Sequence, residues 1–218
     1  MATATVIQRT HTQDAAARRV STSDLIRLSG LGLVLAGLLI AFFPILHPNH
    51  DPAGYANPIW VPVHLMPTGM AVLALFGLMS LFARQGERNG RFGVVAFVAA
   101  ILGTALLLTG TDVEAFIIPF IGLNAPQVMD GPPPIGQIIA WAAAGLIFAV
   151  GYVLQGIAVI RAGVLPRAAG ALLVVGGLGL GIGAATTGML PPVLLLGSLL
   201  FGMALAWLGY SLWSEPSR

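Results

Sequence analysis

The chain has no cysteine and no lysine, and only 8% of its 218 residues are charged. The absence of cysteine excludes disulfides, thiolate metal sites and cysteine nucleophiles. Soluble domains carry about a quarter charged residues, so this chain could not cover a water-facing surface. Its 57% hydrophobic content and mean hydropathy of +0.91 predict a membrane protein instead, because lipid tails accept an apolar exterior.

Several function classes lack their signatures in this sequence. The phosphate loop, the H-E-x-x-H zinc motif and the G-x-S-x-G nucleophile elbow are all missing. A net charge of only +2, with the arginines scattered, excludes a nucleic-acid partner. No ionisable residue falls at mid-depth of a predicted span, which argues against a proton- or sodium-coupled transporter. The sequence therefore favours a protein that is not an enzyme.

Long apolar runs dominate the chain. A helix needs about 20 apolar residues to cross the hydrocarbon core. Six runs are long enough, which predicts an all-α, polytopic membrane protein with a bundle of six transmembrane helices and short loops. The predicted spans are Leu25–Leu46, Ile59–Phe82, Phe92–Thr111 with an apolar continuation to Leu123, Ile135–Ile160, Ala168–Met189 and Pro192–Trp213.

All ten basic residues are arginines, and they lie in alternate gaps between these runs. Short arginine-rich loops remain in the cytoplasm, so both termini are predicted to be cytoplasmic in a prokaryotic cytoplasmic (inner) membrane. An even number of spans agrees with that orientation. The predicted organisation is a polar cytoplasmic arm at 1–24, one transmembrane domain at 25–213 and a cytoplasmic tail at 214–218. The arginines are Arg9, Arg18, Arg19 and Arg27, then Arg84, Arg88 and Arg91, then Arg161 and Arg167, and finally Arg218.

The predicted span Ala168–Met189 is rich in glycine. Gly177 and Gly181 are four residues apart, as are Gly179 and Gly183. Small residues at this spacing let helix backbones approach closely in lipid. We therefore expect this helix to be central, and to support self-association or contact with other membrane-protein subunits. The alternative is that the glycines leave room for a flat ligand such as a pigment, haem or quinone.

Polar residues gather at the outer end of the predicted bundle. Helix rise gives their depth: His47, His64, Asp112 and Trp141 each lie 20 or 21 residues from a cytoplasmic arginine. Glu114 lies slightly further out. The loop between the first two spans adds His50, Asp51, Tyr55 and Trp60.

Three chemistries fit this outer group. His47, His50 and His64, with Asp112 or Glu114, could ligate a transition metal, because imidazole and carboxylate suit zinc, iron and copper. His47 and His64 could be the axial ligands of a haem. His64 with either carboxylate could bind a quinone head group or pass protons. The alternative is that these residues have only a structural or solvated role, because polar and aromatic residues normally collect at membrane–water interfaces.

The segment after the third span decides how the two carboxylates can act. Asp112 and Glu114 are two residues apart, so on a regular helix they point in nearly opposite directions. Both could face one site only if the helix breaks at residues 109–111. We expect a break near Gly110, with the segment Ala115–Leu123 either lying on the outer surface or re-entering the membrane.

These observations leave three functional hypotheses. The first is an accessory or structural subunit of a larger membrane assembly, surrounded by membrane lipids. The second is a membrane protein that binds a metal, haem or quinone at the outer histidine and carboxylate cluster. The third is a carrier or binding subunit for an apolar small molecule, which would need no charged midplane.

Overall fold

The computed structural model describes residues 21–129, 131–186 and 191–214, and these ranges contain helices and no strand. Six helices are long, and short helical turns connect some of them. The elements are α2 (Thr22–Leu46), α3 (Pro52–Tyr55), α4 (Trp60–Gln85), the 3₁₀ turn η1 (Gly86–Asn89), α5 (Gly90–Asp112), the π-helical turn η2 (Val113–Ile117), α6 (Ile118–Asn124), the 3₁₀ turn η3 (Pro126–Val128), α7 (Ile135–Ala162), α8 (Arg167–Ala185) and α9 (Pro191–Ser214).

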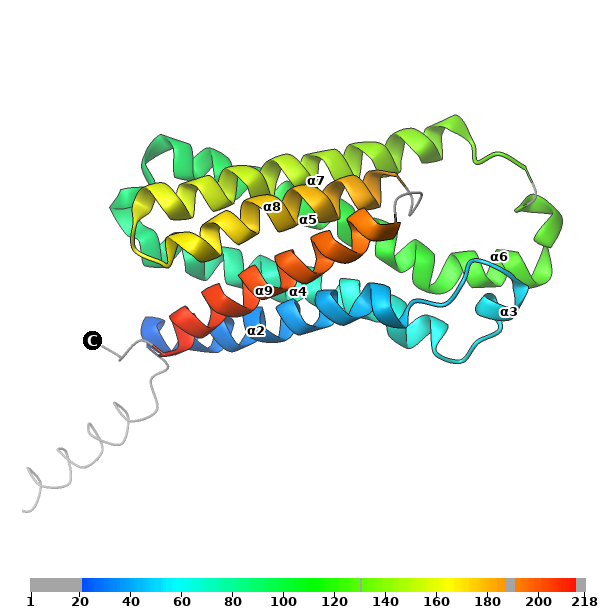
Figure 1. The fold of residues 1–218 in the computed structure, drawn as a ribbon, viewed down its shortest axis with the longest axis horizontal. Helices are drawn as coiled ribbons and strands as arrows, with labels where there is room; N and C mark the ends of the chain where they lie inside the picture. Colours follow the sequence, from blue (N-terminus) through cyan, green and yellow to red (C-terminus); the bar gives the residue numbers. More distant parts are fainter. Residues whose placement is uncertain (1–20, 130, 187–190, 215–218) are drawn as a thin grey trace, which may run out of the picture.

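The long helices form a closed ring (Figure 1). Each long helix packs against the next one in the chain, in the order α2, α4, α5, α7, α8 and α9, and α9 returns to pack against α2. The beginning of α2 and the end of α9 lie at the same end of the bundle, where Arg27 Nε donates to the carbonyl of Trp213 at 3.2 Å. This bond satisfies a carbonyl that the end of a helix leaves free.

Local sequence explains where the helices begin and turn. Ser21 and Asp24 form a reciprocal capping box at the start of α2, as the run of hydroxyl and acidic residues there predicts. Between α4 and α5 the chain turns at Gly86 and Gly90, both with φ of +54°, a region that favours glycine. Asn89 closes this turn by donating to the carbonyls of Phe82 and Gly86.

Among the described residues, five helical segments are long and apolar enough to cross a membrane by length and composition: Thr22–Leu46, Trp60–Asn124, Ile135–Ala162, Arg167–Ala185 and Pro191–Ser214. They indicate a membrane protein. The second segment has 65 residues because it joins α4 to α6 in one helical stretch. The end of the predicted fifth span, most of the predicted N-terminal arm and most of the tail lie outside the described residues.

The glycines of α8 contact neighbours within the chain. Gly177 and Gly181 face Tyr152, Ala149 and Gly145 of α7, while Gly176, Gly179 and Gly183 face α9. The predicted close approach of backbones is therefore present. The expectation of a central helix is wrong, because α8 is one member of the ring, between α7 and α9. These five glycines of α8 all contact α7 or α9 within the same chain.

The predicted break near Gly110 is also wrong. Helix α5 continues through Gly110 to Asp112, and the chain passes into η2 and then α6 without leaving helical conformation. The irregularity is a wider turn, in which the amide of Ile118 donates to the carbonyl of Val113. Pro119 explains its position, because proline has no N–H for the next helical bond and disrupts the regular α pattern before it.

Candidate metal centre

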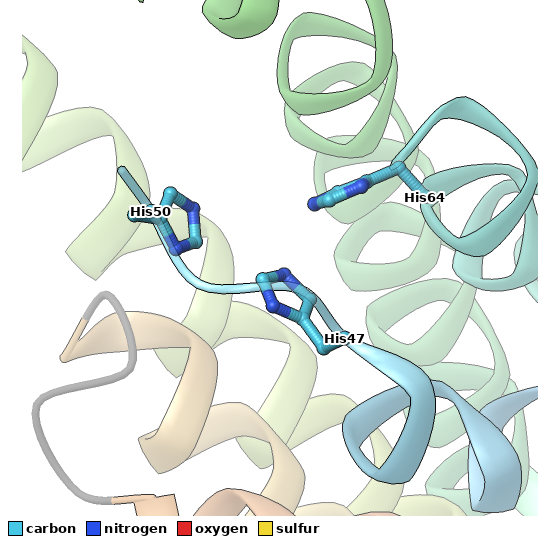
Figure 2. Close-up of side chains that lie close together, drawn as sticks. All are labelled: His47, His50 and His64. Atoms are coloured by element: carbon cyan, nitrogen blue, oxygen red, sulfur yellow. The ribbon is translucent and has the colours of Figure 1, made fainter. Parts of the chain in front are cut away.

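Three histidines meet at the end of the bundle opposite Arg27 and Trp213 (Figure 2). His47 caps the C-terminal end of α2 in an extended conformation, and His50 follows in the loop before α3. His64 projects from the second turn of α4. Figure 2 shows the ring of His64 projecting from a helix, the ring of His47 beginning where another helix ends, and the ring of His50 coming from the loop.

The distances among the rings suit a shared ion. One nitrogen from each histidine lies within 4.8 Å of the others. The ring centroids of His47 and His64 are 4.7 Å apart, and those of His47 and His50 are 5.0 Å apart. Ligand bonds from imidazole to zinc are about 2.0–2.1 Å, so small side-chain rotations could bring all three nitrogens to one ion.

Each imidazole has one nitrogen against an oxygen acceptor. His47 Nδ1 lies 2.6 Å from the carbonyl of Pro48, and His64 Nδ1 lies 2.8 Å from the carbonyl of Trp60. His50 Nε2 lies 3.4 Å from Glu114 Oε2. A carbonyl or carboxylate oxygen can only accept, so the nitrogen that faces it carries the proton in a neutral ring. The lone pairs left for a ligand bond are on Nε2 of His47, Nε2 of His64 and Nδ1 of His50.

His64 is the most deeply placed of the three. Only 2% of its surface is exposed, and its Nε2 has no hydrogen-bond partner among the described residues. Leaving a buried polar atom unpaired costs about 1–3 kcal/mol. A ligand bond from this nitrogen to a cation would remove that cost.

The π-helical turn brings Glu114 to the histidines. The amide of Ile118 donates to Val113, and Pro119 has no N–H to offer. The carbonyl of Glu114 instead accepts the indole N–H of Trp60 at 2.8 Å. Trp60 in turn stacks on His64, with ring centroids 4.2 Å apart. One residue of η2 therefore contacts two members of the site, through its carboxylate and its carbonyl.

Asp112, unlike Glu114, contacts a threonine hydroxyl and not the histidines. Its carboxylate accepts from the hydroxyl of Thr68 at 3.1 Å, and Thr68 also lies 2.9 Å from the hydroxyl of Thr111. Thr68 lies one turn below His64 on α4. Asp112 and Glu114 thus have separate partners, as their spacing predicts, and Glu114 is the carboxylate beside the histidines.

Aromatic rings pack around the histidines. Phe43 packs edge-on against His47 and His64, and Tyr55 packs edge-on against His50 and Trp60. Tyr55 also lies against Gly122 of α6, where an added Cβ would collide with its ring. The loop itself is held by Asp51, whose carboxylate accepts the amide of Gly54 at 2.7 Å.

This enclosure affects the ionisation of the residues outside the helical spans. Burial, followed by the nearby charges of His64 and His50, lowers the pKa of His47 from 6.5 to about 4. Burial, with the charges of Glu114 and Asp51, raises the pKa of Tyr55. At neutral pH His47 is therefore an uncharged imidazole, the form that binds metal, and Tyr55 is a neutral phenol.

The packing around the histidines fits a small ion better than a haem. A haem between His47 and His64 would need a porphyrin-sized slot between rings whose centroids are 4.7 Å apart. Phe43, His50 and Trp60 pack against the same two rings, which leaves no such slot among the described residues. A small ion needs no slot. An open cavity of about 330 Å³, lined by His47 and the loop residues Pro48, Asn49, Asp51, Ala53, Gly54 and Asn57, adjoins the cluster on its loop side.

Two residues take part in contacts that the sequence does not reveal. Trp60, the first residue of α4 and only 1% exposed, links Glu114 to His64. Thr68 donates to the carbonyl of His64 in its own helix at 3.5 Å and also pairs with Thr111 and Asp112 of α5. Pro119, placed five residues after Glu114, was the signal for the freed carbonyl.

Comparison with known proteins adds no functional assignment: no family model, curated protein or solved structure matches this chain.

Proposed function

We propose that the chain crosses a prokaryotic cytoplasmic membrane six times, with both termini in the cytoplasm. The segment Trp60–Asn124 would supply two crossings, because α4 and α5 pack against each other and the chain turns at Gly86 and Gly90. Arg27, Arg84, Arg161 and Arg167 lie near the ends of helices on the side away from the histidines. The arginine rule would then assign that side to the cytoplasm.

We propose further that the protein binds a transition-metal ion at the outer face of this membrane, through His47, His50 and His64. The observation that carries the proposal is the convergence of three imidazole rings, with one nitrogen from each within 4.8 Å of the others. Among the described residues, the buried Nε2 of His64 at this site has no hydrogen-bond partner. Neutral imidazoles suit zinc, copper, nickel and iron. Three protein ligands leave a coordination position open for water or another small ligand.

The hydrogen-bonded surroundings support the same function. Metal-binding histidines usually donate their second ring nitrogen to a carbonyl or carboxylate, which fixes the tautomer and orients the ring. Pro48, Trp60 and Glu114 supply such acceptors here. A structural subunit would not require these three orientations, and an apolar ligand would not use them. Metal binding therefore explains more of this end of the bundle than either alternative.

The direct test is metal uptake by the intact protein. The wild-type chain is purified in mild detergent, stripped with chelator, exposed to Zn²⁺ and analysed for bound zinc after removal of free ion. We expect one zinc per chain. His64→Ala should lose the site, and His47→Ala should weaken it strongly, because each removes one of three ligands.

Asp112→Asn serves as the matched control, because it changes a nearby group that faces Thr68 rather than the histidines. Thermal unfolding of each metal-free variant checks that the bundle remains folded. A folded wild-type protein that retains no zinc, or a His64→Ala variant that retains as much as the wild type, would contradict the proposal.

A further inference from the structure

Glu114 differs from the histidines in what it can offer to an ion. Its Oε2 lies 3.4 Å from Nε2 of His50, the nitrogen on the far side of the ring from the available Nδ1 lone pair. The histidine nitrogens form a group within 4.8 Å of one another, and Glu114 does not belong to that group. The carboxylate is therefore placed behind His50.

The loop gives His50 little support of its own. The side chain of His50 is 52% exposed, whereas His64 is buried in α4 and His47 is held at the end of α2. An exposed imidazole on a loop can rotate about both side-chain bonds and exist as either neutral tautomer. Among the described residues, the carboxylate of Glu114 is the one hydrogen-bond partner of this ring.

The position of Glu114 depends on the irregular turn. Its carbonyl is tied to the indole of Trp60 at 2.8 Å, and its side chain is only 24% exposed. The carboxylate thus starts from a backbone that is fixed to α4, the helix that carries His64. A rigid acceptor on one side of a mobile imidazole is the arrangement that orients a metal ligand.

We propose that Glu114 is a positioning residue of the metal centre and not a ligand: its carboxylate accepts the Nε2–H of His50 and so directs Nδ1 of His50 toward the ion. This inference rests on the proposed metal-binding function. It also explains why η2 departs from α-helical geometry beside the site, because the wide turn releases the carbonyl that Trp60 holds.

A comparison of two substitutions separates positioning from ligation. Glutamine keeps an oxygen of the same reach that accepts an N–H, but a neutral amide is a much poorer ligand for Zn²⁺ than a carboxylate. A positioning residue should therefore tolerate Glu114→Gln, with less than about a threefold loss of zinc affinity, while Glu114→Ala should weaken binding about 10- to 100-fold. Asp112→Asn again serves as the control and should leave the affinity unchanged.

A second readout does not depend on zinc. In ¹⁵N-histidine-labelled protein, long-range proton–nitrogen correlation spectra report which ring nitrogen carries the proton. We expect the Nε2–H tautomer of His50 in the metal-free wild type and in Glu114→Gln, and a mixture of tautomers in Glu114→Ala. In the zinc-loaded wild type, Nδ1 of His50 should be the bound nitrogen.

The outcomes are distinguishable. Equal losses of affinity in Glu114→Gln and Glu114→Ala, zinc on Nε2 of His50, or an Nδ1–H tautomer in the metal-free wild type would each overturn the positioning role while leaving the metal site intact. A wild type that binds no zinc would overturn the proposed function, and the metal-free spectrum would still decide whether Glu114 fixes the ring of His50.

Discussion

The half of the ring formed by α7, α8 and α9 is packed differently from the outer end where α2, α4 and η2 meet. In the first region backbones touch: a Cβ added at Gly145 would lie 2.5 Å from the carbonyl oxygen of Gly181, and one at Gly181 would lie 2.6 Å from that of Gly145. In the second region aromatic and imidazole rings pack against one another, and the buried Nε2 of His64 has no hydrogen-bond partner in the part of the chain that the structure describes.

The comparison shows where a ligand can be held. Glycine contacts stabilise helix pairs in lipid because they maximise close packing, and here they bring the two backbones into contact. At the outer end the backbones are not packed in this way, and side chains with lone pairs and hydrogen bonds lie between them. One bundle thus packs backbone against backbone in one region and gathers groups that can bind a ligand in the other.

The largest effect is expected from disturbing the glycine-packed half. Gly181→Ala places a methyl group against the backbone of α7, which cannot move aside as a side chain can, and should destabilise the protein by about 1–3 kcal/mol. Thermal unfolding in detergent, followed by tryptophan fluorescence, measures the loss.

Gly136→Ala is the matched control, because nothing lies within 4 Å of an added Cβ there and alanine favours a helix over glycine by up to about 1 kcal/mol. If the two variants unfold at the same temperature, the close backbone contact of α7 and α8 is not as described.

A smaller effect is expected at the link between α4 and η2. Trp60→Phe retains an aromatic ring beside His64 but removes the indole N–H, so the carbonyl of Glu114 loses its donor. The cost of leaving this carbonyl unpaired is about 1–2 kcal/mol, and zinc affinity should fall as well.

Trp207→Phe changes an exposed tryptophan of α9, 43% exposed, and should leave both quantities unchanged. Unfolding temperature and zinc affinity are measured for both variants. A Trp60→Phe protein with wild-type values of both would show that Glu114 does not depend on the indole.

The smallest effect is expected from acid. The pKa of His47 is about 4 in the folded protein and 6.5 in the unfolded chain, so between these values the unfolded chain binds a proton that the folded one does not. Stability is therefore full above pH 6.5 and falls as the pH is lowered toward 4. The loss is on the order of 1 kcal/mol, because partial exposure screens the charge.

His64, His50 and Glu114 face His47. The contribution of His47 is therefore measured as the difference between the wild type and a variant without this imidazole. Metal-free wild type and His47→Asn are melted at pH 7.5 and pH 5, and the wild type should lose more stability on acidification. If His47→Asn loses as much, the acid sensitivity belongs to another group.

The level of four outer residues along the bundle could be predicted from the sequence. Counting residues from the arginines puts His47, His64, Asp112 and Trp141 at one level, and contacts between neighbouring helices agree with this. His47 meets His64, Asp112 accepts from Thr68 one turn below His64, and Trp141 packs against Gly110. Helix rise is constant, so such a count needs no knowledge of packing.

The direction in which each side chain points around its helix could not be predicted in the same way. The sequence does not show that α5 continues beyond Gly110, nor that the wide turn before Pro119 frees a carbonyl for Trp60. These features depend on which helix stands opposite and on which donor is near. The choice of Glu114 over Asp112 as the neighbour of His50 follows from them, and so it required the structure.

X-ray absorption spectroscopy of the zinc-loaded wild-type protein tests the central claim most directly. We expect a four-coordinate zinc with three imidazole nitrogens at about 2.0–2.1 Å and one further light atom, and the loss of one imidazole in His50→Ala. A zinc surrounded mainly by oxygen atoms, without the scattering of several imidazole rings, would contradict the claim.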